Sequence, residues 1–303
     1  MKILVIDEEA EEYRTLLSDA THDIDFATTT PADPTCDILL ASPGEAAAAI
    51  KAGCEPKWIQ STWAGVDALL PIIRDKEIQL TGIKGIFGPL MSEYVFAYIL
   101  ADLRDIDYYR EQQQASTWAD FKHPRTLNGQ TMLIVGTGSI GKHLANTANQ
   151  FGMKTIGVNR TGAHHDEFDQ ITTNLDSVVG EADYVIGCLP ETPSTRKVFD
   201  QNCFSSMKPS TTFFNVGRAS SVDDEALIGA LNSKRIRKAV LDVFEQEPLP
   251  MEHPYWTTPN LIVTPHVSAP SRPDDIAGIF LQNLALFERD EPLRHGIDFQ
   301  IGY

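Results

Sequence analysis

The stretch that decides the fold is residues 131–150, T-M-L-I-V-G-T-G-S-I-G-K-H-L-A-N-T-A-N-Q. An apolar run ends at Val135, and Gly136, Gly138 and Gly141 then follow at the spacing G-x-G-x-x-G. This order predicts a buried strand, a tight turn that the first glycine permits, and a helix that the third glycine lets pack closely. The second glycine lets the backbone approach a pyrophosphate, which would lie over the positive end of the helix. The stretch therefore predicts a dinucleotide-binding loop rather than a merely structural turn.

Short apolar runs alternate with helical patterns along the whole chain, an order that predicts a parallel sheet with crossover helices. Including the run at 131–135, six strands are expected in the second part of the chain, the others lying at 154–160, 184–190, 211–217, 237–244 and 260–266. The runs in the first part lie at 1–7, 36–42, 57–66 and 78–82. We therefore expect an α/β protein with two Rossmann-like domains, each built on a doubly wound parallel sheet.

The expected boundaries follow from where the strand series begins and ends. The nucleotide domain is expected at 101–269. A last helical pattern comes after its strands are complete, and we expect it to pack back onto a discontinuous first domain of residues 1–100 and 270–303. Residues 92–114 contain no proline or glycine and read as one long helix with Ser92 as its N-cap.

Composition limits the classes of partner that the chain can bind. With 25 basic and 42 acidic residues, the formal net charge is −17, which argues against nucleic acid and anionic membranes. The four cysteines form no C-x-x-C pair, which favours a reducing cytoplasm over a disulfide framework or a zinc site, and no metal is expected. The N-terminal residues lack the apolar core of a signal peptide, and no apolar run is long enough to cross a membrane. We expect a cytoplasmic protein.

The strand that follows the glycine loop ends in residues that bear on the choice of nicotinamide cofactor. An NAD site carries a carboxylate there, which bonds the ribose 2′-hydroxyl. This chain has Asn159, Arg160 and Thr161 instead; the guanidinium can pair with the 2′-phosphate of NADP, and the threonine hydroxyl can donate to it. We predict a preference for NADPH. The alternative is that Arg160 is a solvated surface residue and that NAD is used.

Three residues late in the chain suit a reaction on a 2-keto or 2-hydroxy acid. Arg218 and His266 each follow an apolar run, so both are expected at the carboxyl edge of the parallel sheet, where ligands bind. A guanidinium can hold a carboxylate, and an imidazole can exchange a proton near neutral pH. Glu247 beside His266 would orient the ring and stabilise the imidazolium. Alone, each would read as a surface or structural residue, so the prediction depends on their convergence.

Several longer segments, which span nearly the whole chain, carry a resemblance to a known family. They are W-A-G-V-D at 63–67, G-I-F-G-P-L-M-S-E-Y-V at 85–95, G-T-G-S-I-G at 136–141, C-L-P-E-T-P-S-T at 188–195, N-V-G-R-A-S-S-V-D at 215–223, L-D-V-F-E-Q-E-P-L-P at 241–250, H-P-Y-W at 253–256 and T-P-H-V-S-A at 264–269. In this order and combination the chain resembles the D-isomer-specific 2-hydroxyacid dehydrogenases, in particular their glyoxylate/hydroxypyruvate reductase A-like branch.

The resemblance implies an enzyme that reduces a small 2-keto acid, such as glyoxylate or hydroxypyruvate, to the D-2-hydroxy acid. It also implies a homodimer with the active site in the cleft between the two domains of each chain. Arg218, Glu247 and His266 match the family's catalytic arginine, glutamate and histidine, with His266 protonating the carbonyl oxygen as hydride is transferred. Asp242 matches an aspartate near the nicotinamide carboxamide.

The resemblance also implies binding residues. For the substrate they are Trp63, Ala64 and Gly65, in a first-domain loop over the carboxylate, with Phe87 and Met91 as a second wall. For NADP, with NAD as the alternative, they are Gly136, Gly138, Ser139, Ile140, Gly141, Asn159, Arg160, Thr161, Leu189, Pro190, Thr195, Val216, Gly217 and Asp242.

The chain departs from the family pattern at two of these segments. Many relatives carry Asn where Phe87 stands, so the pocket is expected to be more apolar here and to admit larger keto acids, and many carry Gly where Ala219 stands. The chain ends at Tyr303, which counts against a long-form phosphoglycerate dehydrogenase. Two alternatives stay open: a non-catalytic dinucleotide sensor, which need not keep the Arg–Glu–His set, and an NAD-linked D-2-hydroxyacid dehydrogenase of other substrate range.

Overall fold

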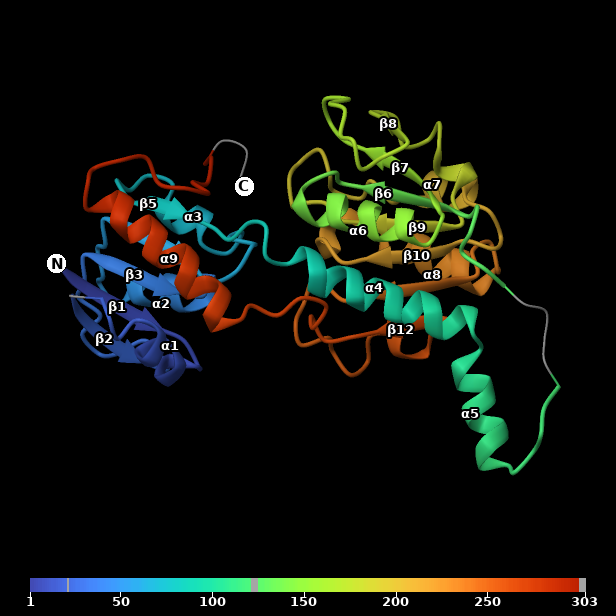
Figure 1. Cartoon of the computed structure of the whole chain (residues 1–303), viewed down its shortest axis with the longest axis horizontal. Coiled ribbons are helices and arrows are strands. Elements are labelled where there is room, and N and C mark those ends of the chain that lie inside the picture. Colours follow the sequence, from blue (N-terminus) through green and yellow to red (C-terminus); the bar gives the residue numbers. More distant parts are fainter. Residues whose placement is uncertain (21, 121–124, 300–303) are drawn as a thin grey trace. The chain divides into compact units, whose positions relative to one another are not determined.

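A computed structural model describes residues 1–20, 22–120 and 125–299, and these divide into two compact units. Unit 1 comprises Met1–Ile86 and the segment that begins at Ser271, and unit 2 comprises Phe87–Pro270. Each unit is built around one parallel sheet with helices packed on it, which confirms the predicted α/β class (Figure 1). Among the described residues, no helix is both long enough and apolar enough to cross a bilayer.

Unit 1 contains a five-stranded parallel sheet in the order β2-β1-β3-β4-β5, a doubly wound arrangement. Its strands are β1 (Lys2–Ile6), β2 (Asp23–Ala27), β3 (Ile38–Ala41), β4 (Trp58–Ser61) and β5 (Gln79–Thr81). Its helices are α1 (Ala10–Leu16), α2 (Pro43–Lys51), α3 (Leu70–Ile73) and α9 (Pro273–Phe287).

Helix α9, from the end of the chain, is built into the core of unit 1. The Trp58 ring stacks on Phe280 with the ring centroids 5.3 Å apart, and on Phe287 at 5.5 Å. The buried Asn283 amide donates to the Gln60 side-chain oxygen at 3.1 Å. These contacts join α9 to β4, so unit 1 is made of two segments far apart in the sequence.

Unit 2 contains a seven-stranded parallel sheet in the order β12-β11-β10-β9-β6-β7-β8. Its strands are β6 (Thr131–Val135), β7 (Lys154–Val158), β8 (Gln170–Thr172), β9 (Tyr184–Gly187), β10 (Thr212–Asn215), β11 (Lys238–Leu241) and β12 (Leu261–Val263). Its helices are α4 (Gly88–Leu103), α5 (Ile106–Gln114), α6 (Ser139–Gln150), α7 (Gln201–Ser206) and α8 (Asp224–Asn232). The six predicted strands are confirmed, whereas the short edge strand β8 was missed. The strand order reverses between β6 and β9, the place where doubly wound sheets bind dinucleotides.

The prediction of one helix over residues 92–114 is wrong at both its start and its middle. Helix α4 begins at Gly88, so Ser92 lies inside the helix and is not its N-cap. The Ser92 hydroxyl instead lies 2.7 Å from Nδ1 of His143 on α6. A Cβ on Gly88 would lie 2.8 Å from the Cβ of His143, so only glycine allows the two helices to pack this closely. This packing places α4 in unit 2, so the units divide after Ile86 rather than near residue 100.

The helix breaks at Asp105, which adopts a left-handed backbone conformation with φ of 51°. Aspartate visits this region more readily than most residues. Helix α5 then runs on in a new direction, and none of its residues is buried. In Figure 1 it continues from the end of α4 and extends away from the sheet of unit 2.

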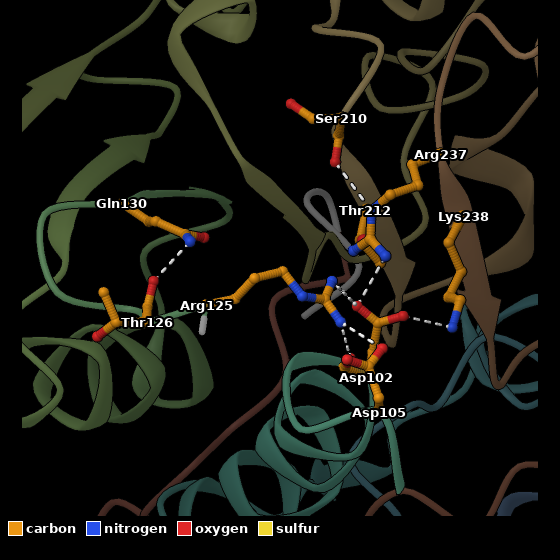
Figure 2. Close-up of polar contacts among 9 residues, drawn as sticks. All are labelled: Asp102, Asp105, Arg125, Thr126, Gln130, Ser210, Thr212, Arg237 and Lys238. Atoms are coloured by element: carbon orange, nitrogen blue, oxygen red, sulfur yellow. Dashed lines mark hydrogen bonds and ion pairs between the residues drawn. The ribbon is translucent and has the colours of Figure 1, made fainter. Parts of the chain in front are cut away.

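A cluster of charges, the Asp102 cluster (Asp102, Arg125, Arg237 and Lys238), joins the end of α4 to the amino end of β11 (Figure 2). The Asp102 carboxylate accepts from Arg237 Nη1 and from Lys238 Nζ, each at 2.7 Å, and from Arg125 Nη1 at 3.3 Å. Burial by itself raises the pKa of Asp102, but the Lys238 hydrogen bond and the two neighbouring cations outweigh it and lower the pKa below its usual value.

Candidate active site

The glycine loop lies at the carboxyl end of β6 and leads into α6, as predicted. Gly136 has a φ of +111°, and a Cβ there would lie 2.5 Å from the Cys188 carbonyl oxygen. A Cβ on Gly141 would lie 2.1 Å from the Gly136 oxygen, so neither position accepts a side chain. A Cβ on Gly138, by contrast, would meet nothing within 4 Å. The backbone at Gly138 is therefore open to a close ligand, as a pyrophosphate site requires.

The turn after β7 is tied to the glycine loop by the side chain of Asn159. Its amide nitrogen donates to Thr137 Oγ1 and to the Ala163 carbonyl, each at 3.0 Å. Its side-chain oxygen accepts from the backbone N–H groups of Thr161 at 3.2 Å and Gly162 at 2.6 Å. Asn159 is therefore the organiser of this turn, while Arg160 and Thr161 are exposed on it. A carboxylate at 159 would lose both donor bonds.

The loops after β9 and β10 meet at the same sheet edge. A Cβ on Gly217 would lie 2.6 Å from the Leu189 backbone nitrogen, so the two backbones pass in contact. Thr195 Oγ1 donates to the Pro190 carbonyl at 2.7 Å and thereby closes the loop after β9. Val216 and Gly217 are buried. The expected cofactor-binding residues of these loops therefore lie next to one another at the carboxyl ends of their strands.

Glu247 and His266, which the sequence placed side by side, form a hydrogen bond. His266 Nδ1 lies 2.9 Å from Glu247 Oε2, and the second oxygen, Oε1, accepts from the Phe244 N–H at 2.9 Å. Because a carboxylate can only accept, Nδ1 carries the proton of this hydrogen bond. The side chains keep 41% and 36% of their surface exposed, so the pair is accessible to a small molecule.

His266 lies in a loop that leaves β12 in a strained conformation. We call residues 264–268 the His266 loop. His266 has a φ of 54°, a region that residues other than glycine seldom adopt and that recurs at functional sites. The backbone N–H groups of Val267 and Ser268 both donate to the Asp242 carboxylate at 2.9 Å. Asp242, expected near the nicotinamide, therefore has both of its oxygens bonded to this loop.

Arg218 follows β10 and is half-buried. Its Nη1 donates to the Gly217 carbonyl at 2.9 Å, and its own carbonyl accepts from Ser221 Oγ at 2.7 Å. Because β10, β11 and β12 are adjacent parallel strands, Arg218 and His266 emerge at the same edge, from strands that lie two strand spacings or roughly 10 Å apart. Glu247 reaches this edge from the loop after β11.

The expected substrate-binding residues differ in exposure. Trp63, Ala64 and Gly65 follow β4 in unit 1, and the Trp63 side chain is half exposed. Ser61 Oγ accepts from the Trp63 N–H at 3.0 Å and donates to its carbonyl at 2.9 Å, which holds the turn. In unit 2, Phe87 and Met91 are buried, and Met91 belongs to the hydrophobic core under α4.

A cavity of about 220 Å³ lies beneath the loop that carries Glu247. Its walls include Ala219, Leu241, Phe244, Leu249 and Tyr255, but none of the Arg–Glu–His set. It is therefore not the place where those three side chains would meet a substrate. Within the described residues, no cluster of His, Cys, Asp and Glu is arranged to hold a metal ion.

This site is also contacted by two residues, Tyr94 and Thr264, that the sequence did not indicate. Tyr94 on α4 places its hydroxyl 2.6 Å from Thr264 Oγ1, and Thr264 Oγ1 donates to Asp242 Oδ1 at 2.6 Å. Both residues lie in the segments that carry the resemblance, but nothing in their spacing indicates that they touch.

Comparison with known proteins places the chain in a family. Residues 96–268 match the family described as D-isomer specific 2-hydroxyacid dehydrogenase, NAD binding domain. A protein of that family from Aeromonas salmonicida has 40% identity and a TM-score of 0.92, with 98% of this chain and 99% of that chain covered. The NADPH-dependent glyoxylate/hydroxypyruvate reductase of Sinorhizobium meliloti, solved with NADP and sulfate, has 28% identity and a TM-score of 0.87, with 100% and 99% covered.

A relative whose activity is named aligns over most of the sequence. Glyoxylate/hydroxypyruvate reductase A of Yersinia enterocolitica is 29% identical over 265 residues, which is 82% of this chain and 82% of that protein.

Proposed function

The chain belongs to the D-isomer specific 2-hydroxyacid dehydrogenases, and on that premise we propose that it reduces a small 2-keto acid to the D-2-hydroxy acid with NADPH. The observation that carries the proposal is the Glu247–His266 pair, 2.9 Å between Nδ1 and Oε2, at the sheet edge where Arg218 and the glycine loop also emerge. This edge combines a proton donor, a carboxylate-binding cation and a dinucleotide loop.

His266 is the proton donor in this proposal. When bound, the reduced nicotinamide supplies a hydride to the carbonyl carbon of the substrate. Because Nδ1 is bonded to Glu247, His266 delivers its proton to the carbonyl oxygen from Nε2. Glu247 stabilises the imidazolium before transfer and fixes the ring plane, and its own second oxygen is held by the Phe244 N–H. An imidazole suits this step because its charge changes near neutral pH.

Arg218 binds the substrate carboxylate. Its planar guanidinium matches a carboxylate in two parallel hydrogen bonds, and its charge polarises the neighbouring carbonyl. The hydrogen bond from Nη1 to the Gly217 carbonyl restrains the side chain before substrate arrives. The backbone N–H groups of residues 63–65 are further candidates for contacts with the carboxylate, since Ser61 holds their turn.

NADPH is the preferred donor in this proposal. Arg160 is exposed on the turn after β7, and residues 159–163 contain no carboxylate to repel a 2′-phosphate. The relative from Sinorhizobium meliloti is described as NADPH-dependent. Glyoxylate and hydroxypyruvate are the proposed substrates because the relatives of named activity act on them.

The proposed setting is a homodimer in the cytoplasm. Helix α5 buries none of its residues, and Ile106 on it is 42% exposed and Trp118 beyond it 97% exposed, surface that a second copy would cover. The four cysteines form no disulfide, although Cys36 and Cys54 bring their Sγ atoms to 3.2 Å, in keeping with a reducing compartment. Sedimentation of the purified protein tests the dimer, and a monomer at micromolar concentration would contradict it.

The proposed reaction is tested by following the absorbance of the reduced nicotinamide. NADPH and NADH are each offered glyoxylate, hydroxypyruvate, pyruvate and phenylpyruvate. Oxidation of NADPH by glyoxylate or hydroxypyruvate is expected, and Arg218→Ala should lower kcat/KM at least about 100-fold because it removes a charged contact to the substrate. Binding of NADPH with no oxidation under any condition would instead favour a dinucleotide sensor.

The cofactor preference is tested by Arg160→Ala. We expect a KM for NADPH about tenfold higher with an unchanged KM for NADH, since only the former carries the 2′-phosphate. Arg289→Ala, at an exposed position after α9, is the matched loss of an arginine and should change neither value. We prefer this variant to Asn159→Asp, because Asn159 holds the turn itself. Equal effects on both cofactors would contradict the assignment of the phosphate site.

A further inference from the structure

The His266 loop is held by one buried carboxylate on both sides of the histidine. Asp242 has no solvent-exposed surface. Its Oδ1 accepts from Thr264 Oγ1 at 2.6 Å and from the Val267 N–H at 2.9 Å, and its Oδ2 accepts from the Ser268 N–H at 2.9 Å. Hydrogen bonds to an ionised acceptor are about twice as strong as neutral ones, so these three restrain the loop more firmly than ordinary backbone contacts would.

The network extends from Asp242 to helix α4 through two hydroxyl groups. Tyr94 Oη lies 2.6 Å from Thr264 Oγ1. The Thr264 hydroxyl has one proton, and it donates this proton to Asp242, so the Tyr94 hydroxyl must be the donor to Thr264. Burial raises the pKa of Tyr94, which keeps its proton in place for this bond. The direction is therefore Tyr94 to Thr264 to Asp242.

This network acts on the part of His266 that Glu247 does not restrain. Glu247 fixes the imidazole ring, whereas Asp242 holds the Thr264 side chain two residues before it and the backbone N–H groups of the two residues after it. His266 has a φ of 54°, and a residue keeps such a conformation only where its surroundings impose it. Loss of the Asp242 contacts would let the loop relax and move the ring relative to the substrate.

We propose that Tyr94, Thr264 and Asp242 form a positioning network that holds the His266 backbone for proton transfer. The proposal rests on the proposed role of His266 as the proton donor. It assigns to Tyr94 and Thr264 a role in the reaction that acts through the position of His266. The network also explains why Asp242 can be buried, because all three of its hydrogen bonds are made within the protein.

The test removes one hydroxyl at a time. Thr264→Val keeps the shape of the side chain and removes the bonds to Tyr94 and Asp242, and Thr264→Ser restores the hydroxyl. For Thr264→Val we expect kcat to fall at least about tenfold, since a small misplacement of a catalytic group can cost as much as about 100-fold. The KM for the keto acid and the Kd for NADPH should stay within about twofold. Thr264→Ser should recover most of kcat.

A kinetic isotope effect separates positioning from general destabilisation. With NADPH deuterated at the transferred position, the effect on kcat should be larger for Thr264→Val than for the unaltered protein, because the transfer step has become slower relative to product release. A merely structural role would lower the Tm and leave the isotope effect unchanged. That result, or equal kcat values for the Val and Ser variants, overturns the proposal.

Tyr94→Phe provides a second variant that removes a single oxygen atom. It should lower kcat in the same direction by a smaller factor, because the bond from Thr264 to Asp242 remains. Tyr98→Phe is the matched control on the same helix, with ring centroids 5.0 Å from Tyr94, and should leave kcat unchanged. Equal kcat values for the two phenylalanine variants overturn the proposed role of Tyr94.

His266→Asn, measured alongside, distinguishes the two proposals. If it keeps the turnover of the unaltered protein, the proposed function and the network both fail. If it is inactive while Thr264→Val has normal kcat and a normal isotope effect, the network alone fails.

Discussion

Asp102 and Asp242 lie near opposite ends of strand β11, and unit 2 holds the two carboxylates with different kinds of donor. At the amino end, Asp102 is surrounded by Arg125, Arg237 and Lys238, two of them within 2.7 Å (Figure 2). At the carboxyl end, Asp242 is bonded to two backbone N–H groups and a hydroxyl. Asp242 is fully buried and Asp102 is partly buried, and only Asp102 is held by cations.

The difference shows how one sheet separates stability from chemistry. Cations at the amino end are used within ion pairs and lower the pKa of Asp102. At the carboxyl end, Asp242 is held by two backbone N–H groups and a hydroxyl, none of which is charged. We expect substitutions at the two aspartates to affect different properties of the protein.

The largest effect is expected for Asp242→Asn. The amide has the same shape, but its NH₂ group would face N–H donors of the His266 loop, so at least one of the three bonds is lost. Because His266 is then misplaced, kcat should fall about 100-fold while the Kd for NADPH changes little. Steady-state kinetics and fluorescence titration with NADPH measure the two quantities. A large rise in Kd with unchanged kcat would mean that Asp242 serves the cofactor instead.

Asp102→Asn should act on stability and leave kcat within about twofold. The substitution removes the negative charge that Arg237 and Lys238 share, and we expect the free energy of unfolding to fall by about 2 kcal/mol at neutral pH. Urea denaturation measures this. If Asp102→Asn loses activity without losing stability, the comparison between the two ends of β11 is wrong.

The difference in unfolding free energy between the unaltered protein and Asp102→Asn should also depend on pH. The pKa of Asp102 is lowered in the folded protein, so its stabilisation is present above the unfolded value of about 3.9 and is lost as pH falls through the folded value. The unaltered protein should therefore lose its advantage over Asp102→Asn as the pH drops below about 4. Paired urea titrations across that range test the sign, and a constant difference in unfolding free energy at all pH values would refute it.

The smallest effect is expected for Arg125→Ala. Arg125 is the most exposed of the three cations, with 38% of its side chain accessible, and its 3.3 Å bond is the longest of the three to the Asp102 carboxylate. An exposed ion pair contributes up to about 1 kcal/mol, so the shift of the urea midpoint should be small. Lys238→Ala, which removes a 2.7 Å bond, should cost more. The reverse order would show that exposure does not rank these cations.

Local patterns were enough to predict most of the fold. The apolar runs of unit 2 became its six predicted strands, and G-T-G-S-I-G became the turn into α6, because both depend on residues close in sequence. The prediction of one long helix at 92–114 was wrong because its break depends on a residue that is distant in sequence. Asp105, where the helix breaks, accepts from Arg125, 20 residues further along the chain. The short strand β8 carried too little apolar pattern to be recognised.

By itself, the sequence determined the α/β class, the glycine loop and the residue types that the reaction needs, because strand period, turn glycines and side-chain chemistry are local properties. The tertiary structure decided which of these residues touch. Glu247 meets His266 across 19 residues, Asp102 meets Arg237 across 135, and Tyr94 meets Thr264 across 170. Such contacts depend on the order of strands in the sheet and on the packing of α4, which arise only when the whole unit folds.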